Sequence, residues 1–341
     1  MPRAVGYDDN PSAKLPSMAR KRGFEDQIAA LEGVRQQPEE DRVEALRKTL
    51  GHRNNFLVAK AADLVREFKL ENLAPELLQA FDRSLENPVK TDPQCWAKNA
   101  ISRALAATEC QECEIFFRGM RHVQMEPVWG GRSDTAGTLR AICALALVQC
   151  RNLSENELLS HLVELLADKD KAVRADVVRA IEQVGSPSAS LLLRLRAILG
   201  ADEPEVLGAC YTCILQIEGV SAIQWVGRFL STGDDNAAEA ALAIAGTHSV
   251  PGFEALRESL AKAEDRWWRS VLISAISLTR QDEALEFLLG LVQTESLDAE
   301  TAIEAILRSV PSQEIITRLQ TTVAGNPRLA QVFSECNVPS R

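Results

Sequence analysis

The sequence predicts an all-α fold, a right-handed α-solenoid of about eight antiparallel helix pairs. Ala and Leu dominate the segments after residue 24, and aromatic residues make up only 5% of the chain, a composition that favours helices over sheets. A set of apolar positions recurs every thirty-odd residues. Pro and Gly interrupt the chain between these sets, which argues against one long coiled coil. We therefore expect a stack of similar helix pairs.

Residues 1–23 differ from the rest of the chain and are predicted to be a flexible basic tail. Pro, Gly and charged residues alternate there, and the apolar core of a secretion signal is missing. Five basic residues stand against two aspartates in this segment. The tail either makes a weak electrostatic contact or has no role of its own. Residues 24–341 form the predicted solenoid.

The repeat is clearest at residues 168–185, where an Asp-rich turn leads into a helix with one apolar stripe from Val173 to Ile181 and then to Gly185. The same frame fits eight anchor residues, which are 30–34 residues apart from Leu139 onwards. The anchors are Val58, Ala97, Leu139, Val173, Val206, Ala237, Trp268 and Asp298. Positions four, seven and eight residues after each anchor are apolar, with the exception of Arg66.

An apolar segment precedes each anchor helix and is predicted to be its antiparallel partner, as at residues 155–168 and 189–199. Gly-Ser-Pro at 185–187 and Ser-Val-Pro-Gly at 249–252 supply tight turns between helices. One helix pair of this length buries too little apolar surface to offset the entropy of the chain. Stacking of neighbouring pairs must therefore stabilise the fold.

The turn aspartate followed by Val-Arg and then Ala-Ile resembles HEAT repeats, particularly the short bacterial kind that is also found in phycobilin lyases. Residues 168–185 match this pattern well. The segments with Asp134 and Leu139-Arg140, and with Asp265 and Trp268-Arg269, match it in part. The resemblance covers about residues 38–310. It implies the fold, whereas a structural motif of this kind says little about function.

Three arginines recur one residue after an anchor. In HEAT-like stacks such arginines pair with the turn aspartate of the same or the adjacent unit, so the resemblance implies a structural Asp-Arg ladder. Its expected members are Asp134 with Arg140, Asp170 with Arg174, and Asp265 with Arg269. The alternative is a line of arginines that faces a ligand.

Trp96 and Trp267 each stand one residue before an anchor, off the predicted core stripe. If they are exposed on a concave face formed by the second helices, they are the type of residue that dominates binding hot spots. If they are buried between adjacent units, they only contribute to packing. The sequence leaves both possibilities open.

Residues 121–137 account for the widest spacing between anchors. Pro127, Gly130 and Gly131 cannot continue a helix, so this segment is predicted to be a projecting loop. It carries Met125 and Trp129, which are costly to expose without purpose. The loop either contacts a partner or folds back and caps its own repeat.

No catalytic residue, metal site or cofactor is predicted. Cys110-Cys113 and Cys210-Cys213 have the spacing of zinc ligands, but the second pair occupies core positions of the frame, where packing explains it. Three glutamates flank the first pair, and an acidic surround argues against a reactive redox pair. The four histidines form no HExxH motif, and the sequence has no phosphate-loop, dinucleotide-binding or nucleophile-elbow motif.

Charge and composition narrow the location and the partners. The chain has 48 acidic and 38 basic residues, which argues against nucleic acid as a partner. It has no run of about 18 uncharged apolar residues, which argues against membrane insertion. Eight cysteines without an export signal indicate a reducing compartment, and we expect a cytoplasmic protein.

The leading hypothesis is a non-enzymatic protein-protein interaction scaffold that binds an unidentified protein through its concave face and the 121–137 loop. Two alternatives follow from family likeness. HEAT-like DNA glycosylases for alkylated bases use a basic concavity with tryptophans and an aspartate, a set that Trp96, Trp267 and Asp265 superficially resemble. A likeness to bilin lyases implies a linear tetrapyrrole ligand, which no residue of the chain specifically supports.

Overall fold

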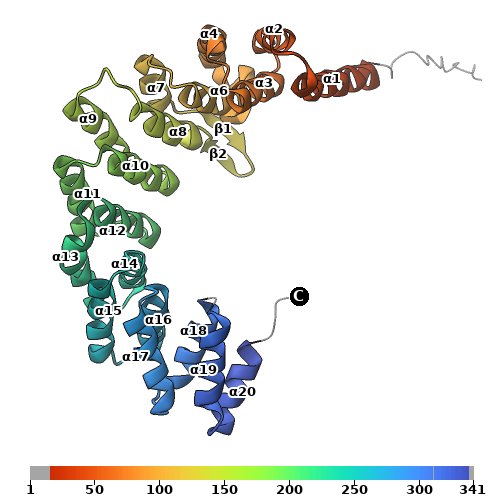
Figure 1. Ribbon diagram of the computed structural model, residues 1–341. Coiled ribbons are helices and arrows are strands. Elements are labelled where there is room, and N and C mark those ends of the chain that lie inside the picture. Colours follow the sequence, from red (N-terminus) through yellow and green to blue (C-terminus); the bar gives the residue numbers. More distant parts are fainter. Residues whose placement is uncertain (1–15, 310, 338–341) are drawn as a thin grey trace, which may run out of the picture. The chain divides into compact units, whose positions relative to one another are not determined.

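The computed structural model describes residues 16–309 and 311–337 and shows an all-α repeat fold (Figure 1). The contacts divide the chain into two compact units, Met1–Leu153 and Ser154–Arg341. Within the described residues, one short β-hairpin in the first unit is the only sheet. Each unit is described separately below.

The first unit begins with α1 (Pro16–Gly33), which is followed by three helix pairs. The pairs are α2 (Glu39–Leu50) with α3 (Asn55–Phe68), α4 (Ala74–Leu85) with α6 (Trp96–Ala107), and α7 (Cys113–Met120) with α8 (Gly137–Leu147). The second helices α3, α6 and α8 each contact the next. The short helix α5 (Pro88–Thr91) and the 3₁₀ turn η3 (Pro93–Cys95) connect α4 to α6.

The second unit consists of six further pairs, in which each second helix contacts the second helix of the next pair. They are α9 (Glu155–Leu165) with α10 (Lys171–Val184), α11 (Pro187–Leu199) with α12 (Pro204–Glu218), α13 (Ile223–Gly227) with α14 (Asp235–Ala245), α15 (Val250–Lys262) with α16 (Arg266–Leu278), α17 (Asp282–Gln293) with α18 (Ala299–Arg308), and α19 (Gln313–Val323) with α20 (Pro327–Cys336). The last pair lies beyond the predicted frame of anchors.

Polar side chains set the helix starts. Asn54, Asp170, Asp234 and Asp265 each accept hydrogen bonds from backbone N–H groups in the first turn of the helix that follows. Ser154 and Glu157 form a reciprocal capping box at the start of α9. These caps satisfy N–H groups that have no partner within the helix, so the turn residues of the repeat fix where each helix begins.

The buried positions confirm the predicted repeat frame. The residue four places after each anchor has an exposed fraction of 0% in all eight predicted repeats. These residues are Ala62, Ile101, Cys143, Val177, Cys210, Ala241, Leu272 and Ala302. Small side chains at this position let successive second helices approach closely, which explains why Ala and Cys occupy it so often.

Two predicted boundaries differ from the structure. Helix α1 begins at Pro16, within the segment predicted as a tail, while residues 1–15 of that segment lie outside the described residues. The predicted loop at 121–137 contains two antiparallel strands, β1 (Met125–Val128) and β2 (Gly131–Asp134). The strands were missed because four residues with Pro and Gly show no clear alternation of apolar and polar side chains.

One described stretch, Pro204–Ser231, has the length and composition to cross a membrane, with a mean hydropathy of 1.5. It is not one straight helix, since it contains α12, α13 and the 3₁₀ turns η4 (Gly219–Ala222) and η5 (Arg228–Ser231). In its most apolar window 56% is buried inside the protein, and α12 contacts both α10 and α14. This burial is typical of a core helix.

Candidate partner-binding site

The β1–β2 hairpin presents an exposed apolar tip. Val128 pairs with Gly131, so that Trp129 and Gly130 form a two-residue turn. Gly130 has a φ of +86°, a conformation that glycine adopts without strain. Trp129 is fully exposed, at 102%, and Met125 and Val128 are exposed at 40% and 48%. The hairpin therefore holds a large aromatic side chain entirely in solvent.

The outer edge of β1 is unsuited to pairing with a further β-strand. Pro127 has no N–H group to donate, and the guanidinium of Arg132 donates to the carbonyl oxygen of Met125 at 2.7 Å. Proline and a charged side chain at an edge both disfavour pairing with another chain. A partner of this hairpin is thus expected to contact its side chains rather than to extend its sheet.

The base of the hairpin, in contrast, is buried and anchored through Glu126. Its carboxylate oxygen Oε1 accepts hydrogen bonds from the backbone N–H of Gln94 at 2.6 Å, from Nε2 of Gln124 at 2.6 Å and from the hydroxyl of Thr135 at 2.8 Å. Burial raises the pKa of Glu126, but these hydrogen bonds outweigh burial and the net pKa is lowered. The charged form therefore holds the hairpin to the start of α6.

Gln94 and Cys95, the two residues before α6, have left-handed backbone conformations, with φ of +58° and +56°. This conformation costs non-glycine residues roughly 1 kcal/mol or more each. The carboxylates around them compensate, because Glu126 binds the N–H of Gln94 and Asp92 accepts from the N–H groups of Ala97 and Lys98 at 2.8 and 2.9 Å. The strained turn fixes the direction in which α6 and Trp96 begin.

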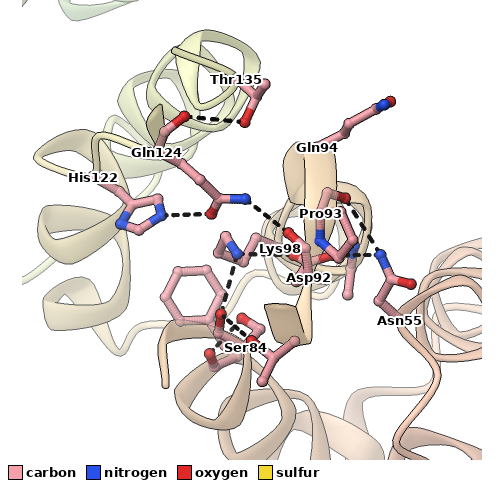
Figure 2. A network of polar contacts seen from close by, with 12 residues as sticks. Asn55, Ser84, Asp92, Pro93, Gln94, Lys98, His122, Gln124 and Thr135 are labelled. Atoms are coloured by element: carbon pink, nitrogen blue, oxygen red, sulfur yellow. Dashed lines mark hydrogen bonds and ion pairs between the residues drawn. The ribbon is translucent and has the colours of Figure 1, made fainter. Parts of the chain in front are cut away.

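A buried ion pair lies at the centre of this network (Figure 2). Nζ of Lys98 is 3.0 Å from Oδ2 of Asp92, and both side chains have an exposed fraction of 0%. Lys98 also donates to the carbonyl oxygen of Ser84, while Asn55 donates to Oδ1 of Asp92 and Gln124 donates to its carbonyl oxygen. These contacts join helices α3, α4 and α6 to the hairpin.

Lys98 was not predicted as a site residue, because the recurring cation after the anchors is otherwise arginine. Lys98 stands one residue after the anchor Ala97, the same place that Arg140, Arg174 and Arg269 occupy in their repeats. This shared position was the available signal. The position after the anchor therefore carries a cation in four of the eight predicted repeats. In the second repeat this cation is Lys98, which is fully buried.

The arginines that follow the anchors pair either with an aspartate of their own turn or with carboxylates of the next turn. Arg140 pairs with Asp134 of its own turn at 2.7 Å and also donates to the carbonyl oxygen of His122. Burial lowers the pKa of His122, and a hydrogen bond with Gln124 partly opposes this effect. Arg140 thus ties the hairpin to α8, while Glu126 ties it to the residues before α6.

Two expected members of the Asp-Arg ladder have other partners, which corrects the prediction. Arg174 binds Asp202 and Glu203, and Arg269 binds Asp298, all in the turn of the following pair. Asp170 and Asp265, the expected partners, instead cap their own helices by accepting from Ala172 and Trp268 N–H groups. The carboxylates of Asp170 and Asp265 bind the backbone of their own helices, so each arginine binds carboxylates of the next turn instead.

Both Trp96 and Trp267 are half exposed, at 47% each. The ring of Trp96 packs edge-on against Phe56 with 5.8 Å between centroids, and Phe56 lies 5.8 Å from Phe24 in a tilted arrangement. The rings of Trp267 and Trp268 are 6.4 Å apart. Each tryptophan therefore packs with one edge and remains accessible with the other, so neither sequence alternative describes it alone.

Cys210 and Cys213 lie in packing positions. Burial raises the pKa of both thiols to about 12. Burial is also the main reason that the pKa of Cys110 is raised, although a hydrogen bond with the backbone of Glu112 lowers it in part. The Cys113 thiol donates to Oδ1 of Asn152 at 2.7 Å. Among the described residues, no group of three or more His, Cys, Asp and Glu side chains could hold a metal ion.

The stacked helix pairs with capped turns define an α-helical repeat protein. Residues 159–245, from α9 to the end of α14, match the family model for HEAT repeats. This match supports HEAT repeats in this segment of the chain, in agreement with the resemblance of its Asp and Val-Arg pattern. No curated protein matches the chain. The hairpin and its polar network lie outside the matched segment.

Proposed function

We propose that this protein is a non-enzymatic scaffold for protein-protein interaction and that the tip of the β1–β2 hairpin is its principal contact. HEAT repeats generally mediate protein-protein interactions, which supports the class of function. The observation that carries the proposal is Trp129, which is 102% exposed on a hairpin with an anchored base. Large aromatic residues dominate binding energy once they enter a partner's pocket.

The anchored base matters for affinity. A flexible loop loses conformational entropy on binding, at about 0.5–1.5 kcal/mol for each side chain that is immobilised. Glu126 and Arg140 hold the base of the hairpin before a partner arrives. The cost of ordering the hairpin backbone is therefore met in part during folding.

A second contact surface is proposed on the second helices. In the first unit Phe56 of α3 and Trp96 of α6 form one such patch, with Phe24 of α1 packed against Phe56, and in the second unit Trp267 of α16 forms another. We further propose that the helix pairs within each unit stack in a right-handed sense and that the concave face of each stack carries these residues. A cytoplasmic location without membrane insertion is part of the same proposal.

The alternative of a DNA glycosylase has less support. The carboxylate of Asp265 accepts the N–H of Trp268 at 2.8 Å and so has a structural role as a helix cap. The groove that Asp265 borders contains four acidic residues and one lysine, which would repel phosphates. No contact in the described residues favours the bilin alternative.

The scaffold proposal is tested by Trp129→Ala in the full chain, with Leu297→Ala as the matched control. Leu297 is equally exposed, at 104%, but lies in the other unit. Since neither side chain is packed, both variants should keep the helicity and melting temperature of the natural chain. Proteins that co-purify with the natural chain, quantified by mass spectrometry, should be lost with Trp129→Ala and retained with Leu297→Ala. Equal recovery with both variants would contradict the proposal.

A further inference from the structure

Helix α11 carries a row of apolar side chains on its exposed face. The row follows intervals of four, three and one residues, so its members share one face of the helix over about two turns. They are Leu191, Leu195, Ile198 and Leu199, with exposed fractions of 66%, 55%, 60% and 62%. Single exposed leucines are common on protein surfaces, whereas a contiguous apolar patch indicates a contact site. We call these four residues the α11 stripe.

Both charged residues of α11 are already paired within the second unit. Nε of Arg194 donates to Oε1 of Glu218 at 2.8 Å, and its guanidinium lies 4.5 Å from the ring centroid of Trp225. Nε of Arg196 donates to Oδ2 of Asp202 at 3.0 Å. Both arginine side chains are partly buried by these contacts. The α11 stripe therefore offers aliphatic contacts to a partner, and the charges of its own helix are satisfied without one.

The lack of acidic residues distinguishes α11 from the other first helices. In the described chain, every other first helix of eight or more residues contains at least one Asp or Glu. On α15, which also has 13 residues, the exposed positions include Glu254, Arg257, Glu258 and Lys262. Helix α11 has no Asp or Glu. Although the chain has a net charge of -10, two copies can therefore meet at α11 without bringing carboxylates of this helix together.

We propose that the α11 stripe binds the α11 stripe of a second copy of this chain. Leu191, Leu195 and Leu199 are four residues apart and form a ridge, which fits into the groove beside the same ridge of another helix. An uncharged aliphatic stripe is complementary to itself, so a single contact about a two-fold axis covers both stripes. Complementary charge would select a different protein, and the stripe offers none. This contact goes beyond the proposed function and does not depend on Trp129.

The size of the α11 stripe determines how strong the dimer is. A stable interface buries about 800 Å² of each partner. Four aliphatic side chains that are already partly covered supply less than this area, so the dimer should be reversible, with a dissociation constant in the micromolar range. The contacts are apolar and the two acidic copies repel each other. Added salt should therefore strengthen the dimer, because it screens the repulsion.

Sedimentation velocity of the purified full chain tests the proposal. The sedimentation coefficient should rise with concentration across the micromolar range. Leu191→Gln with Leu195→Gln should keep the melting temperature, because both positions are exposed and glutamine suits a helix. The same double variant should raise the dissociation constant of the dimer by about tenfold or more, because each contact loses four leucines.

The matched control is Val220→Gln with Leu297→Gln, which removes two exposed aliphatic side chains elsewhere in the same unit. This control should dimerise as the natural chain does. Trp129→Ala should also dimerise normally, which separates this inference from the scaffold proposal.

A crosslink tests the location of the contact. A benzophenone amino acid in place of Leu195 should give, on irradiation of the purified chain, an adduct of twice the chain mass. The same replacement at Leu297 should not give this adduct.

Three results would overturn the inference. The first is a sedimentation coefficient that stays at the monomer value throughout. The second is equal dimerisation of the Leu191 and Leu195 double variant and its control, because the copies would then meet elsewhere. The third is an adduct at position 195 that forms only in lysate and only with a different protein, which would assign the stripe to that protein.

Discussion

Lys98 and Asp92 are the residues on which the first unit depends most. Their ion pair is fully buried, and Asp92 also caps α6 through two backbone N–H groups. A buried pair adds little net stability compared with a well-packed apolar pair, but loss of one partner leaves the other charge buried and uncompensated. The pair therefore favours this one arrangement of α3, α4 and α6, because other arrangements would leave a buried charge without its partner.

Lys98→Met is predicted to lower the free energy of unfolding by about 3–5 kcal/mol, because it leaves Asp92 without its cation and the Ser84 carbonyl without its donor. Chemical denaturation followed by circular dichroism measures this change. Lys90→Met, at an exposed lysine on α5, is the control and should change stability by less than about 0.5 kcal/mol. A Lys98→Met chain as stable as the control would show that the pair is not structural.

Glu126 gives the hairpin a pH dependence with a defined sign. Its folded pKa is lowered from the ordinary value of 4.5, so its stabilisation is complete above pH 4.5 and is lost as the pH falls through the lower folded pKa. Glu126→Gln should therefore melt below the natural chain at pH 7, and the difference should shrink toward pH 3. Glu114→Gln, at an exposed position, is the control. A difference in melting temperature that stays constant across this range would contradict the account.

At the scale of elements, the second helices were predictable and the hairpin was not. The positions four places after the anchors are all buried, because the apolar stripe of a helix repeats over several turns and gives a strong signal. The strands of the hairpin have only four residues each, and their stability comes from contacts of Glu126 and Asp134 with other elements. The contact of Glu126 with Gln94 joins residues 32 positions apart, which local sequence patterns cannot reveal.

The candidate site was predicted in part for the same reason. Pro and Gly excluded a helix around Met125 and Trp129, and both side chains are exposed on the β1–β2 hairpin. The partners of Arg174 and Arg269 were assigned to the wrong aspartates, because spacing alone does not distinguish a capping carboxylate from a pairing one. The burial of Lys98 against Asp92 became visible only in the three-dimensional arrangement.

For the whole molecule, the family match and the distinctive features lie in different units. The HEAT-repeat segment occupies residues 159–245 of the second unit, whereas the anchored hairpin belongs to the first. Repeats of this kind provide a stable stack of helices, and departures from the repeat are where a particular protein acquires its partner. The inserted hairpin is such a departure, and it carries the principal proposed contact.

The most direct test of the central proposal replaces Trp129 with a photoreactive benzophenone amino acid and irradiates the full chain in lysate. The account predicts a covalent adduct with a defined protein, because an exposed hot-spot residue lies in its partner's pocket. The same replacement at Leu297 should give no such adduct, although this position is equally exposed. Adducts that are the same at both positions, or absent at Trp129, would contradict the claim that the hairpin tip binds a partner.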